Sequence, residues 1–220
     1  MQSSRGVVYM TSVIRKVFNN FSSGLSDFKN RYKLPEEFHS SQELKIMHIS
    51  DTPESIYSHI YKMLNYSQPD VIIHTGDLVD NLKLEDAGSE MIPLYQKKSA
   101  EFISNLEKLT SARIIYVPGN HDDLSIIKDN TKRSEVVAEG TIIDLDGVKI
   151  GLAHYPENLP QTADINLFGH NKQSEFESEN KYLNGILNIN YLLLPSKTDY
   201  KVNYPWTVDQ GRQYKRFNMI

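Results

Sequence analysis

From residue 43 onward, short apolar runs alternate with longer stretches of helical periodicity. Residues 44–49, 71–74 and 112–117 are mostly apolar, have the length of buried strands, and each leads into a turn. Between these runs, residues 54–65 and 90–109 have the length and pattern of helices. The chain therefore contains two strand–helix–strand units, which predicts an α/β domain.

The second half of this region has a different pattern. Residues 140–145 and 148–153 flank Asp146-Gly147, a dipeptide typical of a tight β-hairpin turn. Residues 165–168 and 182–194 supply further strand material. We therefore expect the sheet structure here to be antiparallel or mixed.

The N-terminal segment, residues 1–42, is predicted to be a basic, partly helical arm. Residues 10–32 place apolar side chains mostly three or four positions apart, with an interruption near residues 22–24. Six basic residues against one acidic residue give residues 1–33 a charge of +5 and leave -9 for the remainder. The arm is expected either to pack its apolar stripe on the rest of the protein or to present a basic surface to a membrane or nucleic acid. Residues 43–220 contain no obvious linker and are predicted to form one domain.

Composition limits the chemistry that the chain can perform. The sequence of 220 residues has no cysteine, which excludes disulfides, thiolate nucleophiles and Cys-ligated metal centres. Any metal must bind to Asp, Asn, His or Glu. The net charge of -4 argues against wholesale non-specific binding to nucleic acid. The most apolar N-terminal run, between Gly6 and Ile14, is far shorter than the ~20 residues that span a bilayer, and no cleavage signal follows it. A cytoplasmic protein without a transmembrane segment is expected.

Several predicted strands lead directly into a turn that carries a metal-competent side chain. Carboxylate and amide oxygens suit hard divalent cations, and imidazole suits metals such as iron and zinc. Gly76, Gly119 and Gly169 would let these turns approach one another closely. The five turns, in chain order, are Ser50-Asp51-Thr52, Gly76-Asp77-Leu78-Val79-Asp80, Gly119-Asn120-His121-Asp122, Ala153-His154-Tyr155 and Gly169-His170-Asn171-Lys172.

In their order and spacing, these five turns resemble the motifs of the calcineurin-like metallophosphoesterases. That family carries Asp-x-His, Gly-Asp-x-x-Asp, Gly-Asn-His-Asp/Glu, a later His, and Gly-His-x-His. The resemblance covers about residues 44–172, and the run from His74 to Asp80 is similar to the cyclic nucleotide phosphodiesterase branch. It implies a four-layer α/β/β/α sandwich, in which two mixed sheets are flanked by helices.

The resemblance also implies roles for individual residues. Asp77 matches the carboxylate that bridges two metals, and Asp51 would belong to the first metal site. Asn120, His154 and His170 would complete the second site. His121 would act as the acid or as the oxyanion stabiliser. The implied reaction is the hydrolysis of a phosphate mono- or diester by metal-activated water.

Two positions depart from the family pattern. Pro53 and Lys172 stand where the first and last motifs have histidines, so the first metal site keeps only Asp51 and the shared Asp77. One hypothesis is a one-metal enzyme in which the Lys172 ammonium holds the phosphate. A second is a water-rich first site that takes Mg or Mn weakly. A third is a catalytically weakened binding or regulatory module with this fold.

The expected cofactor is a divalent metal, in the first place Mn²⁺, with Fe²⁺, Zn²⁺ or Ni²⁺ as alternatives. One ion would bind firmly, and a second would bind weakly or not at all. The expected partner is a phosphoester substrate, whose identity the loops do not reveal. A nuclease that uses the basic N-terminal arm is the alternative activity, so nucleic acid is a possible partner. The sequence does not indicate an oligomeric state.

Overall fold

The structure is a computed structural model that describes residues 33–83, 89–172, 176 and 179–212. The chain separates into two compact units, Met1–Pro35 and Glu36–Ile220. The helix predicted within residues 10–32 lies outside the described residues. The arm boundary at residue 42 stays a prediction. Within the described residues, no helix has the length and apolar character needed to cross a membrane.

Six strands form the larger sheet, here called sheet A, in the order β10-β9-β1-β2-β3-β4. Strands β1 to β4 are parallel, whereas β9 is antiparallel to β1 and β10 is antiparallel to β9. In the register of the parallel part, Ile46 pairs with Val71, which pairs with Arg113. The strands are β1 (Leu44–Ile49), β2 (Val71–His74), β3 (Arg113–Tyr116), β4 (Glu135–Val136), β9 (Asn188–Leu194) and β10 (Thr198–Asn203).

Four strands form sheet B in the order β5-β6-β7-β8. Strands β5 and β6 make the predicted hairpin, and both residues of its Asp146-Gly147 turn have positive φ, 54° and 77°. Strands β6, β7 and β8 are parallel, so this sheet is mixed, as expected. The strands are β5 (Thr141–Leu145), β6 (Val148–Leu152), β7 (Ile165–Phe168) and β8 (Lys181–Asn184).

The main hydrophobic core lies between the two sheets. Both sheets contribute alternate aliphatic side chains to it, as expected where one face of a strand packs on another sheet. Ile73 and Ile115 come from sheet A, and Ile150 and Leu167 from sheet B; all four are fully buried. The predicted α/β architecture with two mixed sheets is therefore confirmed.

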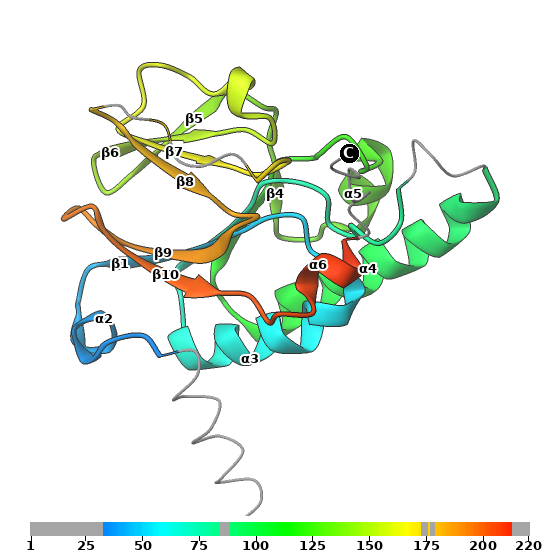
Figure 1. Ribbon diagram of the computed structural model, residues 1–220, viewed down its shortest axis with the longest axis horizontal. Helices are drawn as coiled ribbons and strands as arrows, with labels where there is room; N and C mark the ends of the chain where they lie inside the picture. Colours follow the sequence, from blue (N-terminus) through cyan, green and yellow to red (C-terminus); the bar gives the residue numbers. More distant parts are fainter. Residues whose placement is uncertain (1–32, 84–88, 173–175, 177–178, 213–220) are drawn as a thin grey trace, which may run out of the picture. The chain divides into compact units, whose positions relative to one another are not determined.

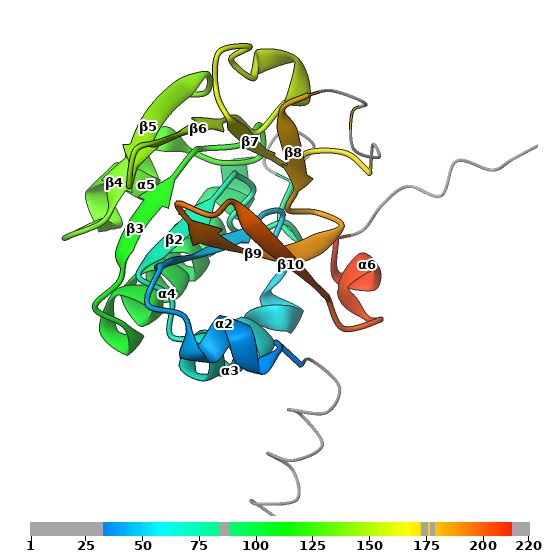
Figure 2. The same cartoon turned by 90° about the vertical axis from the view of Figure 1, so that its left-hand side faces the viewer.

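Helices cover the other face of sheet A. Figures 1 and 2 show α3 and α4 on the side of sheet A that faces away from sheet B. On the outer face of sheet B, the described residues show the segment 156–164, whose Pro160 and Ala163 lie over Gly151 of β6. The helices are α2 (Glu36–Ser40), η1 (Glu54–Ile56), α3 (Tyr57–Ser67), η2 (Ser89–Met91), α4 (Ile92–Leu109), α5 (Leu124–Asn130), η3 (Pro156–Asn158) and α6 (Val208–Gly211).

Three features that the sequence did not specify bear on the site. The strand residues expected within 182–194 belong to two strands, because the chain leaves sheet B after Asn184 and enters sheet A at Asn188. A Cβ added at Gly185, in this turn, would lie 2.8 Å from His48 Nε2, so the turn passes very close to β1. The apolar pattern did not predict strand β10 or helix α6. Helix α6 lies in the closing segment, which is polar and gives no periodic signal.

Candidate metal centre

The carboxyl ends of the parallel strands bring the predicted motifs to one edge of the two sheets. The turns after β1, β2 and β3 follow neighbouring strands of sheet A, and they carry Asp51, Asp77 and Asn120. Strands β6 and β7 are parallel neighbours in sheet B, and the turns after them carry His154 and His170. This placement follows the general rule that α/β sheets bind ligands beyond the carboxyl ends of their strands.

Four side-chain atoms converge between these turns. Asn120 Oδ1 lies 3.0 Å from His154 Nε2 and 3.1 Å from His170 Nδ1. The two imidazole nitrogens lie 3.3 Å apart, and His154 Nε2 lies 3.5 Å from Asp77 Oδ2. Two ligand atoms that each lie about 2.1 Å from an ion are separated by about 3.0 to 3.4 Å, depending on the ligand–metal–ligand angle. The measured pairs are therefore spaced about as far apart as two ligands of one transition-metal ion.

The chemistry of these donors fits the same conclusion. His154 Nδ1 lies 2.7 Å from the Thr75 carbonyl oxygen, which can only accept, so this nitrogen carries the proton and Nε2 presents its lone pair. The Asn120 amide nitrogen lies 3.1 Å from His121 Nε2, which leaves the amide oxygen to face His154 and His170. Lone pairs of Asn120 Oδ1 and His154 Nε2 thus face each other across 3.0 Å. A divalent cation suits this arrangement, because both atoms could bind it through these lone pairs.

Asp51 lies beside this cluster. Ligand atoms of Asp51, Asp77 and His154 all lie within 4.8 Å of one another, and all three residues are buried. Asp51 Oδ2 accepts hydrogen bonds from Ser50 Oγ at 2.6 Å and from the His170 backbone N–H at 3.1 Å. The first and last motifs are therefore joined directly by the Asp51 carboxylate.

The backbone at the site is strained at three of these positions. Asp51, Asp77 and His170 have φ values of 51°, 56° and 67°, in the left-handed region that few residues other than Gly adopt, with Asn, Asp and His as the commonest exceptions. Such strain gathers at functional sites, where the surrounding contacts hold it in place. The three residues are thus held in conformations that their local sequence does not favour.

The glycines of the motifs make the close approach possible, as predicted. A Cβ at Gly76 would lie 2.4 Å from His154 Nδ1, and one at Gly119 would lie 2.3 Å from Asp77 Oδ1. A Cβ at Gly169 would lie 1.9 Å from the Ser50 hydroxyl oxygen. Any side chain at these three positions would push the ligand-bearing turns apart.

Asp122 joins the second motif to the third. Its Oδ2 accepts the backbone N–H groups of Asp77 at 2.7 Å and Gly119 at 2.9 Å. Its Oδ1 accepts the Leu78 N–H at 2.9 Å and the Tyr95 hydroxyl at 2.8 Å. Burial raises the pKa of Asp122, and the hydrogen bonds from its partners oppose this rise. Since all four partners donate, the ionised carboxylate is the form that fits the site.

The buried carboxylates of the site repel one another, and a positive charge beside them would stabilise their ionised forms. Burial raises the pKa of Asp77 well above its usual value, and the charges of Asp51 and Asp122 raise it further. Burial and the same kind of repulsion, from Asp51 and Asp77, raise the pKa of Asp80 to about 8. Lys83 donates to Asp80, and its charge opposes the rise in the pKa of Asp77 as well. The sequence motifs did not identify Lys83, because it lies beyond the Gly-Asp-x-x-Asp pattern.

The two predicted residues outside the cluster, His121 and Lys172, lie in different environments. The His121 backbone N–H donates to Asp77 Oδ1 at 3.0 Å, and its ring is half-buried next to Asn120. The Lys172 ammonium lies 2.5 Å from Asp209 Oδ2, and both side chains are about half exposed, at 47% and 49%. The structure therefore places Lys172 against helix α6.

Two histidines that the motifs do not include lie beneath the site. His74 Nδ1 accepts the Gly76 N–H at 3.2 Å, so its Nε2 donates to Thr52 Oγ1 at 2.9 Å. Thr52 Oγ1 in turn donates to the Leu78 carbonyl at 2.9 Å. His48 Nε2 lies 2.9 Å from the Thr75 hydroxyl. Burial lowers the pKa of both rings, that of His48 to about 3, so both are neutral and hold the turns after β1 and β2.

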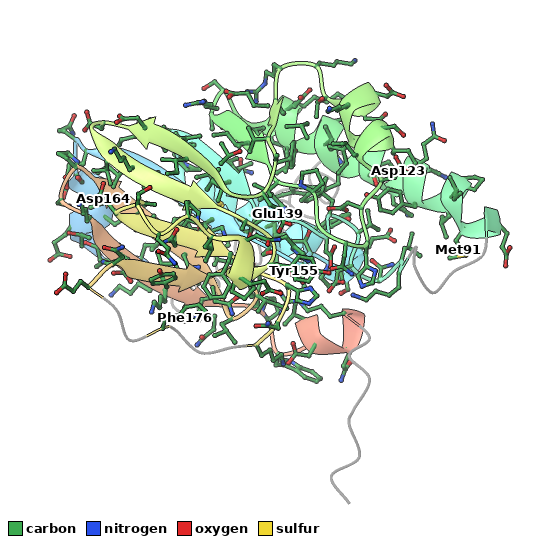
Figure 3. All side chains as sticks on the ribbon, turned by 90° about the horizontal axis from the view of Figure 1, so that it is seen from above. Met91, Asp123, Glu139, Tyr155, Asp164 and Phe176 are labelled. Carbon is green, nitrogen blue, oxygen red and sulfur yellow. The ribbon has the colours of Figure 1, made fainter. Side chains whose placement is uncertain are left out.

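Glu139 and Tyr155 hold the histidine turns from the other side. Glu139 Oε1 accepts the backbone N–H groups of His154 and Tyr155, each at 2.7 Å (Figure 3). The Tyr155 ring lies 4.0 Å from the His170 ring, measured between centroids. The pattern around Glu139 in the sequence gives no sign of this role, because the contact spans a hairpin. Sequence reasoning therefore missed Glu139.

Comparisons with known proteins identify the family of the chain. The model of the family described as calcineurin-like phosphoesterase matches residues 44–218. Among solved structures, TT1561 of Thermus thermophilus aligns with a TM-score of 0.50 and 11% identity, over 74% of this chain and 99% of its own. Yfce, a phosphoesterase from E. coli, aligns with a TM-score of 0.48 and 17% identity, over 72% of this chain and all of its own. No curated protein matches. The family match spans most of the chain and all five motifs, and the chain therefore belongs to the calcineurin-like phosphoesterase family.

Proposed function

We propose that this protein hydrolyses phosphate mono- or diesters at one principal metal site. The observation that supports this proposal is that His154 Nε2 lies 3.0 to 3.5 Å from ligand atoms of Asn120, His170 and Asp77. A bound divalent ion, in the first place Mn²⁺, would act there as a Lewis acid that activates water and stabilises charge on the phosphoryl group. The residues that would hold it are Asp51, Asp77, Asn120, His154 and His170.

The protein groups around the ion have complementary tasks. Asp77 would supply negative charge to a bound ion through Oδ2, while its Oδ1 accepts the His121 N–H at 3.0 Å. This contact keeps His121 at the edge of the site, where its Nε2 lies 3.1 Å from the Asn120 amide nitrogen. A protonated ring that exchanged the Asn120 contact for one to the substrate would donate a proton to the departing alkoxide or a hydrogen bond to a phosphate oxygen. Asp51, whose ligand atom lies within 4.8 Å of those of Asp77 and His154, would help to orient a bound phosphate group.

The deciding measurement is metal content together with hydrolysis of bis(p-nitrophenyl) phosphate. Wild-type protein should bind one ion per chain tightly and hydrolyse the diester. Asp77→Asn removes the charge without changing the shape of the side chain, and it should abolish both properties. The matched control is Asp129→Asn, because Asp129 is an exposed carboxylate on α5. Activity that persists in Asp77→Asn would refute the site, and wild-type protein that takes up no metal would favour a binding or regulatory module.

The substrate class is tested with the same protein. We expect faster hydrolysis of bis(p-nitrophenyl) phosphate or p-nitrophenyl phosphate than of single-stranded DNA, because residues 34–220 carry more acidic than basic charge. A clear preference for DNA that weakens steeply with salt would instead support the nuclease alternative. The ratio of the two small-substrate rates decides between monoesters and diesters.

A further inference from the structure

The charged side chain of Arg212 is fully buried beside the metal centre. It is 1% exposed, although it lies in the polar closing segment of the chain. A buried guanidinium is costly unless its donors are satisfied. Arg212 Nε donates to the Asp51 carbonyl at 2.8 Å, and Nη1 donates to the Ile186 carbonyl at 2.7 Å. Nη2 lies 3.4 Å from the Ser50 carbonyl, so two consecutive carbonyls of the turn after β1 face the same guanidinium.

The two carbonyls belong to the turn that carries Asp51. Asp51 has a φ of 51°, a conformation that costs about 1–2 kcal/mol for an L-residue and that needs support from its surroundings. The Asp51 carboxylate is held on its other side by Ser50 Oγ and the His170 N–H. Arg212 therefore fixes the peptide groups on both sides of the Asp51 Cα, while other partners fix its carboxylate.

The Arg212 side chain is itself held in place. Its guanidinium carbon lies 4.8 Å from the centroid of the Tyr204 ring, within cation–π range, and the Tyr204 hydroxyl donates to the Gly185 carbonyl at 2.8 Å. Arg212 Nη1 also lies 3.6 Å from Asp209 Oδ1, one turn earlier on α6. Because these contacts hold the guanidinium in place, the guanidinium can in turn hold the turn after β1 that it contacts.

Helix α6 also contacts both positions that depart from the family motifs. A Cβ at Gly211 would lie 2.9 Å from both Cβ and Cγ of Pro53, so α6 packs directly on the buried proline. Asp209 pairs with Lys172 at 2.5 Å. The two side chains that replace histidines, one in the first motif and one in the last, thus meet the same short helix.

We propose that Arg212 is a positioning residue for the metal centre and that contacts of α6 link the first motif to the last. In a two-metal site, an ion bound in the first site would make this link instead. Arg212 holds the Asp51 turn, Gly211 covers Pro53, and Asp209 holds Lys172. This inference rests on the proposed function, since it explains how a site with one ion keeps Asp51 in place. It assigns a task to the closing segment, which lies beyond all the sequence motifs.

The first test measures Mn²⁺ affinity by calorimetry on metal-free full-length protein. Loss of a group that orients a ligand from outside the coordination shell lowers metal affinity by ~10–100-fold. Arg212→Ala should show this loss, and added guanidinium chloride at low millimolar concentration should restore part of the affinity. Arg212→Lys keeps the charge but loses the planar set of guanidinium donors. Its Mn²⁺ affinity should lie between those of wild type and Arg212→Ala. The matched control is Arg113→Ala, because Arg113 is half-exposed and pairs with Glu135 away from the site.

The outcomes separate this inference from the proposed function. If wild-type protein binds no Mn²⁺, the proposed function fails. If wild-type protein binds one ion and folded Arg212→Ala binds it equally well, only the role of Arg212 fails. Should Arg212→Ala not fold, as judged by circular dichroism, the affinity of Arg212→Lys decides, and an unchanged value overturns the inference.

A second test concerns the contacts of α6. The double variant Pro53→His with Lys172→His restores the ligand types of the family motifs. Because α6 packs against both positions, we expect elemental analysis to give one ion per chain, as in wild type. A stoichiometry of two would overturn the assignment of α6, since it would show that the first site accepts an ion while the helix is present.

Discussion

Asp122→Asn is the substitution that most directly tests how the site is held together. The carboxylate accepts four hydrogen bonds, from the N–H groups of Asp77, Gly119 and Leu78 and from the Tyr95 hydroxyl. An asparagine amide offers one acceptor and one donor at the same two places. Whichever way it turns, its NH₂ group must face at least one backbone N–H that it cannot satisfy.

The magnitude follows from counting these bonds. A buried donor without a partner costs about 1–3 kcal/mol, and hydrogen bonds to an ionised group contribute about 1.5–3 kcal/mol where neutral ones contribute less. We therefore expect Asp122→Asn to lower the free energy of unfolding by about 2–4 kcal/mol. For a domain of this size, this corresponds to a fall in Tm of about 5–15 °C.

Thermal and urea unfolding of metal-free protein measure this loss without interference from metal binding. Tyr95→Phe removes one of the four donors and should cost only about 1 kcal/mol. Asp129→Asn, on the exposed face of α5, should stay within about 0.5 kcal/mol of wild type. An Asp122→Asn protein as stable as the wild type would contradict the assignment of Asp122 as the ionised link between the second and third motifs.

Three further predictions follow from the same contacts. Gly119→Ala places a Cβ 2.3 Å from Asp77 Oδ1, so it should destabilise the protein by about 1–3 kcal/mol and strongly reduce Mn²⁺ binding; unchanged calorimetric affinity would contradict the close approach of the turns. His48 has its pKa lowered by burial to about 3, below the ~6.5 of an unfolded chain, so its contribution to stability is complete above pH 6.5 and falls by about 1.4 kcal/mol per pH unit as the pH drops towards 3. Urea unfolding at pH 7 and pH 5 should therefore show a smaller loss of stability in His48→Gln than in wild type, and equal losses would exclude His48 as the source. Removal of metal with EDTA should lower Tm, because an ion present at 100 times its Kd stabilises the folded state by about 2.7 kcal/mol. A Tm that does not respond to EDTA would argue against a tightly held ion.

The sequence by itself determined the strands that carry the site and the residue types at their ends. Strands β1, β2 and β7 begin and end at the predicted residues, because mostly apolar runs of four to six residues bounded by turns have few other solutions in an α/β domain. The glycines at positions 76, 119 and 169 were also readable, since only glycine permits the backbone contacts that the motifs need. The turns that carry the proposed ligands Asp77, Asn120, His154 and His170 lie at one edge of the two sheets, and His154 Nε2 lies within 3.5 Å of the other three side chains.

Only the tertiary structure decided what holds these ligands in place. Glu139 and Arg212 contact the site through pairings between segments that no periodicity in the sequence links. The environment of Lys172 was equally hidden, because its partner Asp209 lies 37 residues further along the chain. A strand or a motif is encoded locally, by side chains that are neighbours in the sequence. The burial of Arg212 depends instead on carbonyl groups of Ser50, Asp51 and Ile186, which become its neighbours only when the chain has folded.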